Sequence, residues 1–282
     1  TFQFDIITPC FCGGAEPEKQ AEIRATSIRG QLRWWFRTLG GFKSLDPMPV
    51  RDQEALIFGS TAGDEGRAGK VILRVCSATC GSSLNSTTVK DADQLGAPVQ
   101  HPKGYVLFPL RSNPRKGVYS GKGVFNGGRL PRFSLRVTWM GAPAQWRDLE
   151  ALIGIWGNLG GLGFRQRRAM GAVAFTGQTP SISPCLERFR SAKAILVKSL
   201  PASDAESAIV ALASWLKGWR SHGRTVDHSH ARHPNPPHNP GFDPYAKNDH
   251  DRGADCLSRR GSPNDHTFRP ALGLPIIQRF QS

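Results

Sequence analysis

Arginines and glycines gather in two short segments of the 282-residue chain, residues 27–37 and 160–168. The guanidinium group offers a fork of donors that fits phosphate oxygens. Glycine lets the backbone approach an anion closely and exposes its N–H groups. These residue types, close together and repeated in two places, predict a surface that holds the backbone of a nucleic acid.

The second segment, Gly160–Arg168, joins three glycines to three arginines. It follows a predicted helix and lacks the Gly-Lys-Ser/Thr ending, so it is not a nucleotide P-loop. A basic surface turn is the alternative, but the position between a helix and a strand favours binding. The predicted phosphate-binding residues of this segment are Gly161, Gly163, Arg165, Arg167 and Arg168.

In the first segment, arginines recur every four residues at positions 29, 33 and 37 and would form a stripe along a helix. Like charges at this spacing repel, and an anion along the stripe would relieve the repulsion. Ser27 is predicted to cap this helix, which should end near Leu39. The N-terminus of a helix attracts anions. The predicted nucleic-acid contacts here are Arg24, Ser27, Arg29, Gly30 and Arg33.

Two adjacent tryptophans lie in the same predicted helix. Trp35 shares the apolar face with Ile28, Leu32 and Phe36, so we expect it in the core. Trp34 lies off that face and could stack on a base or pack under a neighbouring loop, and packing is the favoured interpretation. A further basic stretch between Arg111 and Arg136 could line a groove, although such loops also occur in subunit contacts.

Net charge supports a polyanionic partner. The chain carries 37 Lys and Arg against 22 Asp and Glu, a formal charge of +15. Between residues 94 and 186 the only acids are Asp148 and Glu150, against 12 basic residues. A field of one sign over such a stretch is typical of phosphate binding. No apolar run is long enough to span a bilayer, so no membrane partner is expected.

Residues suited to catalysis or metal binding do not form a recognisable site. Seven of the eight histidines lie between residues 222 and 266, and their spacing matches no tight zinc pattern. No Gly-x-Ser-x-Gly elbow supports a serine nucleophile, and no paired carboxylates flank the glycines. The six cysteines include no Cys-x-x-Cys pair and favour reduced thiols in the cytoplasm. We therefore expect no catalytic residue, no metal and no cofactor.

The hydrophobic pattern predicts an α+β fold. Alternation predicts strands at 2–6 and 133–139. Further strands are expected at 71–75, 105–110 and 172–175. Helical spacing predicts helices at 27–39 and 149–159, and Glu54–Phe58 is expected to form an apolar turn. The order strand, helix, strand, strand, helix, strand is the ferredoxin-like plan, shared with RRM-type RNA binders. Long insertions are expected around 77–130.

The chain changes character after residue 180, where we place a domain boundary between 1–180 and 181–282. Ser203–Glu206 has the form of a capping box and should open a helix carrying Ile209, Leu212, Leu216 and Trp219. A strand is expected at 195–197, a long, partly mobile His/Pro-rich loop at about 221–267, and a docked apolar end at 268–280.

Several of these motifs together resemble the RAMP superfamily of CRISPR effector proteins. The residues concerned are Ile7-Thr8-Pro9, Gly13-Gly14, the run from Ile23 to Arg37, Ile57–Ser60, Gly69–Val71, Gly160–Arg168 with Gly171, and Leu272–Pro275. The Trp-Trp-x-Arg form, Trp34 to Arg37, looks most like the Cmr one-type subunit of type III-B complexes. Ala169-Met170 departs from the family pattern before Gly171.

The resemblance implies a ferredoxin-like body followed by a degenerate second ferredoxin-like half. It implies a non-catalytic subunit that contacts CRISPR RNA and target RNA and assembles with other Cmr-type RAMP subunits. Two alternatives remain: a RAMP-type endoribonuclease that matures CRISPR RNA, which would need a histidine beside the glycines, and a mainly structural scaffold subunit.

Overall fold

The computed structural model describes residues 1–17, 19–61, 66–77, 87–89, 101–107, 122–125, 132–183, 185, 202–221, 223–225 and 242–244. It contains two compact units, Thr1–Ile209 and Val210–Ser282, and each is described by itself. The domain boundary predicted at residue 180 stays a prediction, as do the strand at 195–197 and the docked end at 268–280, which lie outside the described residues.

A four-stranded antiparallel sheet forms the centre of the first unit. Strand β1 (Phe2–Ile6) pairs on one side with β5 (Arg132–Trp139) and on the other with β6 (Val173–Phe175). Strand β2 (Val71–Ser77) adds to the far side of β5, which gives the order β2-β5-β1-β6. All four strands were predicted, β1 and β5 from apolar alternation, and the α+β class is confirmed.

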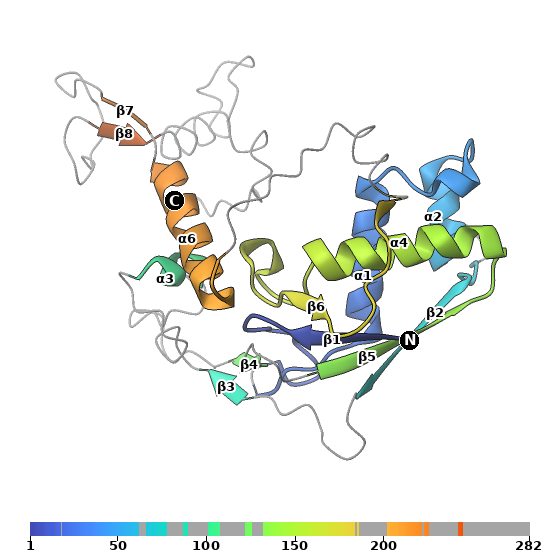
Figure 1. The fold of residues 1–282 in the computed structure, drawn as a ribbon, viewed down its shortest axis with the longest axis horizontal. Coiled ribbons are helices and arrows are strands. Elements are labelled where there is room, and N and C mark those ends of the chain that lie inside the picture. The colour runs from blue at the N-terminus through green and yellow to red at the C-terminus, as the bar shows by residue number, and fades with distance from the viewer. Residues whose placement is uncertain are drawn as a thin grey trace. The chain divides into compact units, whose positions relative to one another are not determined.

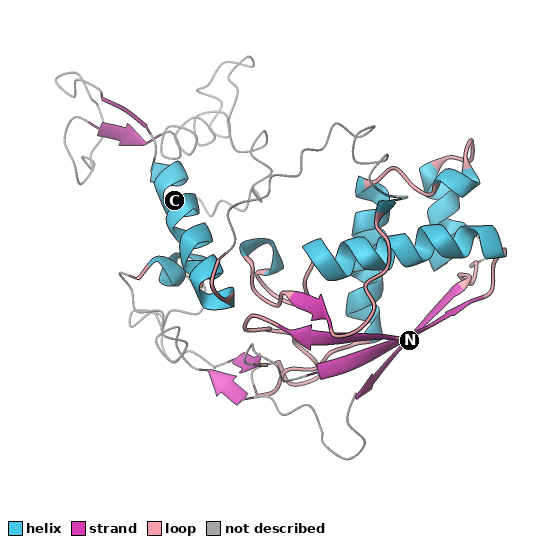
Figure 2. Ribbon diagram, viewed as in Figure 1, coloured by secondary structure: helices cyan, strands magenta, loops and turns pink. Residues whose placement is uncertain are grey.

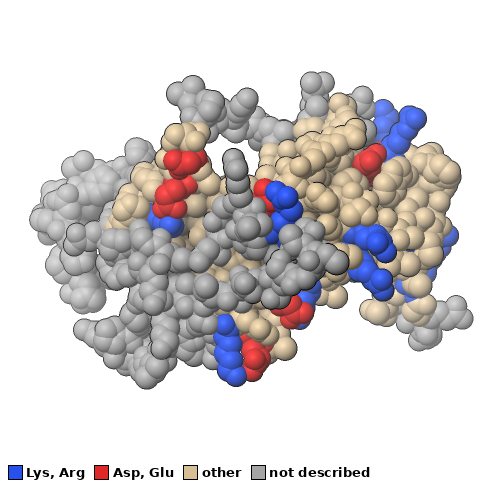
Figure 3. Space-filling view, turned by 60° about the horizontal axis from the view of Figure 1, so that its bottom comes forward, with Lys and Arg blue, Asp and Glu red and all other residues tan. Residues whose placement is uncertain are grey.

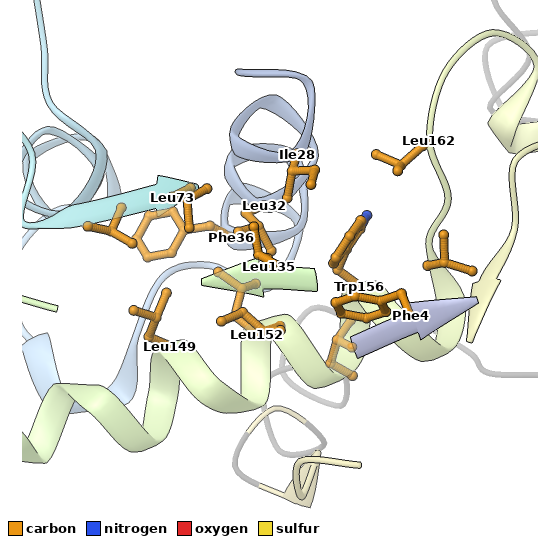
Figure 4. Packing of buried hydrophobic residues seen from close by; sticks show 14 of the residues in the cluster. Phe4, Ile28, Leu32, Phe36, Leu73, Leu135, Leu149, Leu152, Trp156 and Leu162 are labelled. Carbon is orange, nitrogen blue, oxygen red and sulfur yellow. The ribbon is translucent and has the colours of Figure 1, made fainter. Parts of the chain in front are cut away.

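Two helices cover one face of this sheet, as Figures 1 and 2 show. They are α1 (Ala25–Thr38) and α4 (Pro143–Leu159), and α2 (Val50–Phe58) packs against α1. Apolar side chains from both layers meet between the helices and the sheet (Figure 4). The fully buried members with the largest side chains include Phe4, Phe36, Phe133 and Trp156. Burial of each such side chain stabilises the fold by about 1.5–3 kcal/mol.

Three local predictions are wrong. The segment 54–58 is the end of α2 and not a turn. Helix α1 begins at Ala25 after Arg24, so Ser27 lies within the first turn and does not cap it. Residues 105 and 106 of the strand predicted at 105–110 are the end of helix α3 (Pro102–Val106), and residues 108–110 lie outside the described residues. Proline suits the first position of a helix, and the His101 side chain caps it by accepting the backbone N–H of Lys103 at 3.2 Å.

Smaller elements flank the sheet. A two-stranded pair, β3 (Thr87–Val89) and β4 (Lys122–Val124), lies within the predicted insertion. Short 3₁₀ turns occur at η1 (Lys43–Leu45) and η4 (Gln166–Arg168).

In the C-terminal part, α6 (Ala205–Ser221) is confirmed as a helix, but Asp204 caps it, because its carboxylate accepts the Ser207 N–H at 2.7 Å. In the second unit, β7 (Gly223–Thr225) pairs with β8 (Phe242–Pro244), within the region predicted to be a loop.

Two side chains join α1 to its neighbours. The Arg29 guanidinium donates to the carbonyls of Phe58 and Val71, both at 3.0 Å, and so links α1 to the end of α2 and the start of β2. The Glu54 carboxylate of α2 accepts Arg33 Nε at 2.5 Å and Arg37 Nε at 2.6 Å. The Arg37 guanidinium, followed by that of Arg33, lowers the pKa of Glu54, although burial opposes the shift.

We therefore expect Glu54→Gln to lower the free energy of unfolding at pH 7 by about 2 kcal/mol, since two arginines lose a mostly buried partner. The folded-state pKa of Glu54 lies below its ordinary value. The stabilisation is then complete above about pH 4.3 and is lost as pH falls through the folded-state pKa. Urea titrations of both proteins between pH 7 and pH 3 measure this.

Asp52→Asn is the matched control, because Asp52 lies exposed on the same helix. It should change stability by less than about 0.5 kcal/mol. An equal loss for the two variants, or a loss from Glu54→Gln that does not shrink on acidification, would contradict the assigned role of Glu54.

Candidate nucleic-acid interface

The glycine–arginine loop, residues 160–171, leaves α4 and returns to β6. Its backbone is left-handed at four positions, Gly163, Arg165, Ala169 and Gly171, with φ between 63° and 75°. Non-glycine residues seldom adopt this conformation, and they keep it only when their surroundings impose it. The loop is therefore a built structure in the first unit and not a flexible turn.

The residues that follow β1 impose this shape. The Thr8 hydroxyl donates to the Ala169 carbonyl at 2.6 Å and accepts the Ala172 N–H at 2.9 Å. Farther along, the Phe164 N–H donates to the Phe11 carbonyl at 2.9 Å, and the Gly171 N–H donates to the Pro9 carbonyl at 2.8 Å. The segment 8–12 and the glycine–arginine loop thus form one backbone-bonded unit.

Two predicted glycines serve this packing. A Cβ at Gly163 would lie 2.5 Å from the Phe11 carbonyl oxygen, and one at Gly161 would lie 2.9 Å from the Gly171 carbonyl oxygen. Both glycines are needed for close approach, as the sequence predicts, but the group approached is the protein's own backbone. Gly30 differs, because nothing lies within 4 Å of the Cβ that it lacks.

The arginines of the two segments have different surroundings. Arg24 donates to the Gly13 carbonyl at 3.0 Å, and Arg165 Nε donates to the Val106 carbonyl at 2.9 Å. Arg29 and Arg33 hold α1 to its neighbours as described above. Arg167 is exposed and makes no hydrogen bond or ion pair with any described residue. Of the six predicted arginines, Arg167 is the one best placed to meet an external anion.

Helix α1 and the glycine–arginine loop meet at a cavity of about 650 Å³. Guanidinium, amide and indole groups line it together with glycine backbone. The lining residues are Gly30, Gln31, Trp34, Trp35, Arg37, Leu159, Gly160, Gly161, Gln166 and Arg167. Two segments that lie about 130 residues apart in the sequence therefore form one surface, as the paired motifs predict.

The tryptophan pair forms part of that surface. Trp35 is partly buried against the core, as expected, and its ring centroid lies 4.9 Å from that of Trp34 in an edge-to-face contact. Trp34 is 46% exposed, so the packing under a loop that the sequence favoured is wrong. An exposed indole beside cationic and amide groups suits stacking on a nucleobase.

The cavity thus contains only part of the predicted site. Gly30, Gly161 and Arg167 line it, whereas the other predicted residues do not: Arg24, Ser27, Arg29, Arg33, Gly163, Arg165 and Arg168. Sequence reasoning missed Gln31 and Gln166. Gln31 could have been found from helical spacing, since it lies three residues before Trp34 and on the same side of the helix.

The described residues contain no group of three His, Cys, Asp or Glu side chains that could hold a metal ion. The seven histidines between residues 222 and 266 lie outside the described residues. Cys10 and Cys12 are buried thiols whose sulfurs lie 3.2 Å apart, and the hydrogen bond to Cys12, followed by burial, raises the pKa of Cys10. Among the described helices, none has the length and apolar character needed to cross a membrane.

Comparison with known proteins identifies the family. The model of the RAMP superfamily matches residues 3–174, a range that reaches all four strands of the sheet and contains both segments of the cavity. The chain belongs to the RAMP superfamily. The resemblance that the sequence motifs indicate is thereby confirmed.

Two curated relatives of this RAMP protein come from Pyrococcus furiosus. CRISPR system Cmr subunit Cmr1-1 is 26% identical over 175 residues, 61% of this chain and 46% of the relative. Subunit Cmr1-2 is 39% identical over 61 residues, 21% of this chain and 32% of the relative. The matched region thus spans less than half of either relative.

The crystal structure of Cmr1 from the same organism, in its apo form, superposes with a TM-score of 0.52 at 18% identity. The superposition covers 77% of this chain and 71% of that one. At this identity the match supports a shared fold.

The left-handed backbone of the loop gives a direct test. Glycine reaches φ near 63° without the cost that alanine bears, so Ala169→Gly should raise the free energy of unfolding by about 0.5–1 kcal/mol. Ala172→Gly is the control, because Ala172 has no positive φ and the same change should destabilise by a similar amount. Thermal and urea unfolding measure both, and a loss of stability from Ala169→Gly would contradict the described loop.

Proposed function

We propose that this chain is a non-catalytic RNA-binding subunit of a type III-B CRISPR ribonucleoprotein complex, and that it contacts guide RNA, target RNA or both. The observation that carries the proposal is the cavity between α1 and the glycine–arginine loop, where an exposed cation, two amides and an indole converge. The matched relatives are named Cmr subunits, which supports assembly with other subunits of that kind.

The geometry reduces the set of residues proposed to bind RNA to those that line the cavity. Arg167 would meet a phosphate, Trp34 would stack on a base, and Gln31 and Gln166 would donate to phosphate or base oxygens. Gly30 leaves room for the ligand on α1. The remaining predicted arginines act indirectly: Arg24, Arg29, Arg33 and Arg165 hold together the elements that border the cavity.

The proposed lack of catalysis is supported by the lining of the cavity. None of its described residues carries an imidazole or a carboxylate, the groups that most often move protons in RNA cleavage. His101 caps helix α3, whose Val106 carbonyl accepts Arg165 of the loop, and its ring nitrogen accepts the backbone N–H of Lys103. Incubation of the protein with repeat RNA tests the endoribonuclease alternative, since defined cleavage would favour it.

We also propose that the sheet and its two helices form a ferredoxin-like body. The order β2-β5-β1-β6, with every neighbouring pair antiparallel, follows the strand–helix–strand–strand–helix–strand plan with β1 and β5 in the centre. A degenerate second ferredoxin-like half within residues 181–282 stays part of this proposal.

Replacing Arg167 with alanine should weaken single-stranded RNA binding about five- to tenfold, because one phosphate contact is lost. The slope of log affinity against log salt should fall by about 0.7, the value per phosphate for single strands. Fluorescence anisotropy between low and moderate salt measures both. Arg147→Ala on α4 is the control. Arg147 is an exposed arginine that does not line the cavity. An affinity that does not change with salt would refute the proposal.

Replacing Trp34 with alanine should weaken RNA binding about tenfold and leave the salt slope unchanged, because stacking involves no counterion release. Trp215→Ala removes another exposed indole, on α6, and should leave affinity within about twofold. If both variants lose affinity equally, or if Trp34→Ala lowers the salt slope, Trp34 does not stack on RNA.

A further inference from the structure

The sheet face opposite α1 and α4 carries a second basic surface, separate from the cavity. Along β2 the side chains of Val71 and Leu73 point to the helices and are buried, so Ile72 and Arg74 point to the other face, where both are exposed. On β5, Arg136 and Thr138 are exposed on that same face. Figure 3 turns the lower side of the molecule forward and shows, at the middle right, a group of Lys and Arg atoms without acidic atoms beside it.

Two arginines lie directly opposite each other on this face. Arg74 pairs with Arg136 in the register of β2 and β5, so their Cβ atoms are about 5 Å apart. Neither makes a hydrogen bond or ion pair with a described residue. The acid of this face on β1, Asp5, already accepts Arg132 Nε at 2.8 Å, which raises the pKa of Arg132. Like charges opposed in this way destabilise a sheet unless an anion lies between them.

The residues beside the arginine pair indicate which class of macromolecule would carry the anion. Ile72 lies two positions from Arg74 and is 48% exposed, and Met140, at the end of β5, is 54% exposed. The Met140 N–H donates to the Lys70 carbonyl, so the pairing of β2 with β5 continues one step beyond the two strands. Arginine and methionine beside aliphatic groups are typical of protein interfaces. Sequence-tolerant RNA surfaces use exposed aromatic rings, and on β2 and β5 the aromatic residues Phe133 and Trp139 point to the helices.

We infer that this face, defined by Lys70, Ile72, Arg74, Arg136, Thr138 and Met140, docks an acidic protein segment of another subunit. Its carboxylates would lie between the two guanidinium groups, and its apolar side chains would cover Ile72 and Met140. The inference rests on the proposed function in one respect: it takes the partner to be a protein of the same complex. RNA binding at the cavity is independent of it.

Zero-length coupling tests the proposal in the complex purified from source cells through a tag on this chain. Arg74→Lys keeps the charge and supplies an amine that a carbodiimide condenses with any carboxylate in contact. We expect mass spectrometry to find residue 74 joined to an Asp or Glu of another subunit. Arg147→Lys, exposed on α4, is the control and should give no such product. Absence of coupling at residue 74, or coupling only to carboxylates of this same chain, would overturn the proposal.

Charge removal provides an independent readout. The double variant Arg74→Gln, Arg136→Gln should lower recovery of the coupled subunit at least about tenfold, since two charge-assisted contacts are lost. Its Tm should not fall, because the opposed charges are gone, and its affinity for single-stranded RNA should stay within about twofold. If RNA affinity falls as far as in Arg167→Ala while the subunits stay bound, the face binds RNA and the proposal is wrong.

Discussion

The close approach of two backbone segments determines the candidate site. The N–H groups of Phe164 and Gly171 in the glycine–arginine loop donate to carbonyls of residues 8–12, and a Cβ at Gly163 would collide with the Phe11 carbonyl. The Thr8 hydroxyl bonds the C-terminal end of the loop, at Ala169 and Ala172. Arg165 and Ala169 then turn through left-handed backbone, which leaves Arg167 outermost between them. The position of Arg167, the exposed arginine of this loop, thus depends on contacts made by residues near the N-terminus.

The three arginines along α1 bind different groups of the protein, although they form one stripe of like charge. Helical spacing places Arg29, Arg33 and Arg37 on one side, and repulsion among them must be relieved. Within the first unit, two backbone carbonyls satisfy Arg29, and the Glu54 carboxylate satisfies the other two. The acceptors for these three guanidinium groups are therefore groups of the protein itself, namely two carbonyl oxygens and one carboxylate. The basic stripe therefore anchors α2 and β2 and, through α1, fixes the wall of the cavity.

Periodicity predicted the elements that bury an apolar side, because burial imposes a repeat of two on β1 and β5 and of about four on α1 and α4. It failed at residues 105 and 106, where a short apolar run fits a strand or a helix equally well and Pro102 favours the helix. Gly30 and Gly161 line the same cavity, as the paired motifs indicated. The partners of Arg29 and Arg165 did not, because the carbonyls of Val71 and Val106 carry no side-chain signature in the sequence.

The same packing leaves two different surfaces. Helices α1 and α4 cover one face of the sheet. The cavity lies between residues 30–37 of α1 and the glycine–arginine loop that follows the end of α4. The other face stays open at β2 and β5, where arginines lie opposed without aromatic neighbours. An indole with mixed polar donors suits a nucleic acid, and guanidinium groups flanked by aliphatic side chains suit an acidic protein. The sheet thus separates the surface proposed for RNA from the surface proposed for a protein partner.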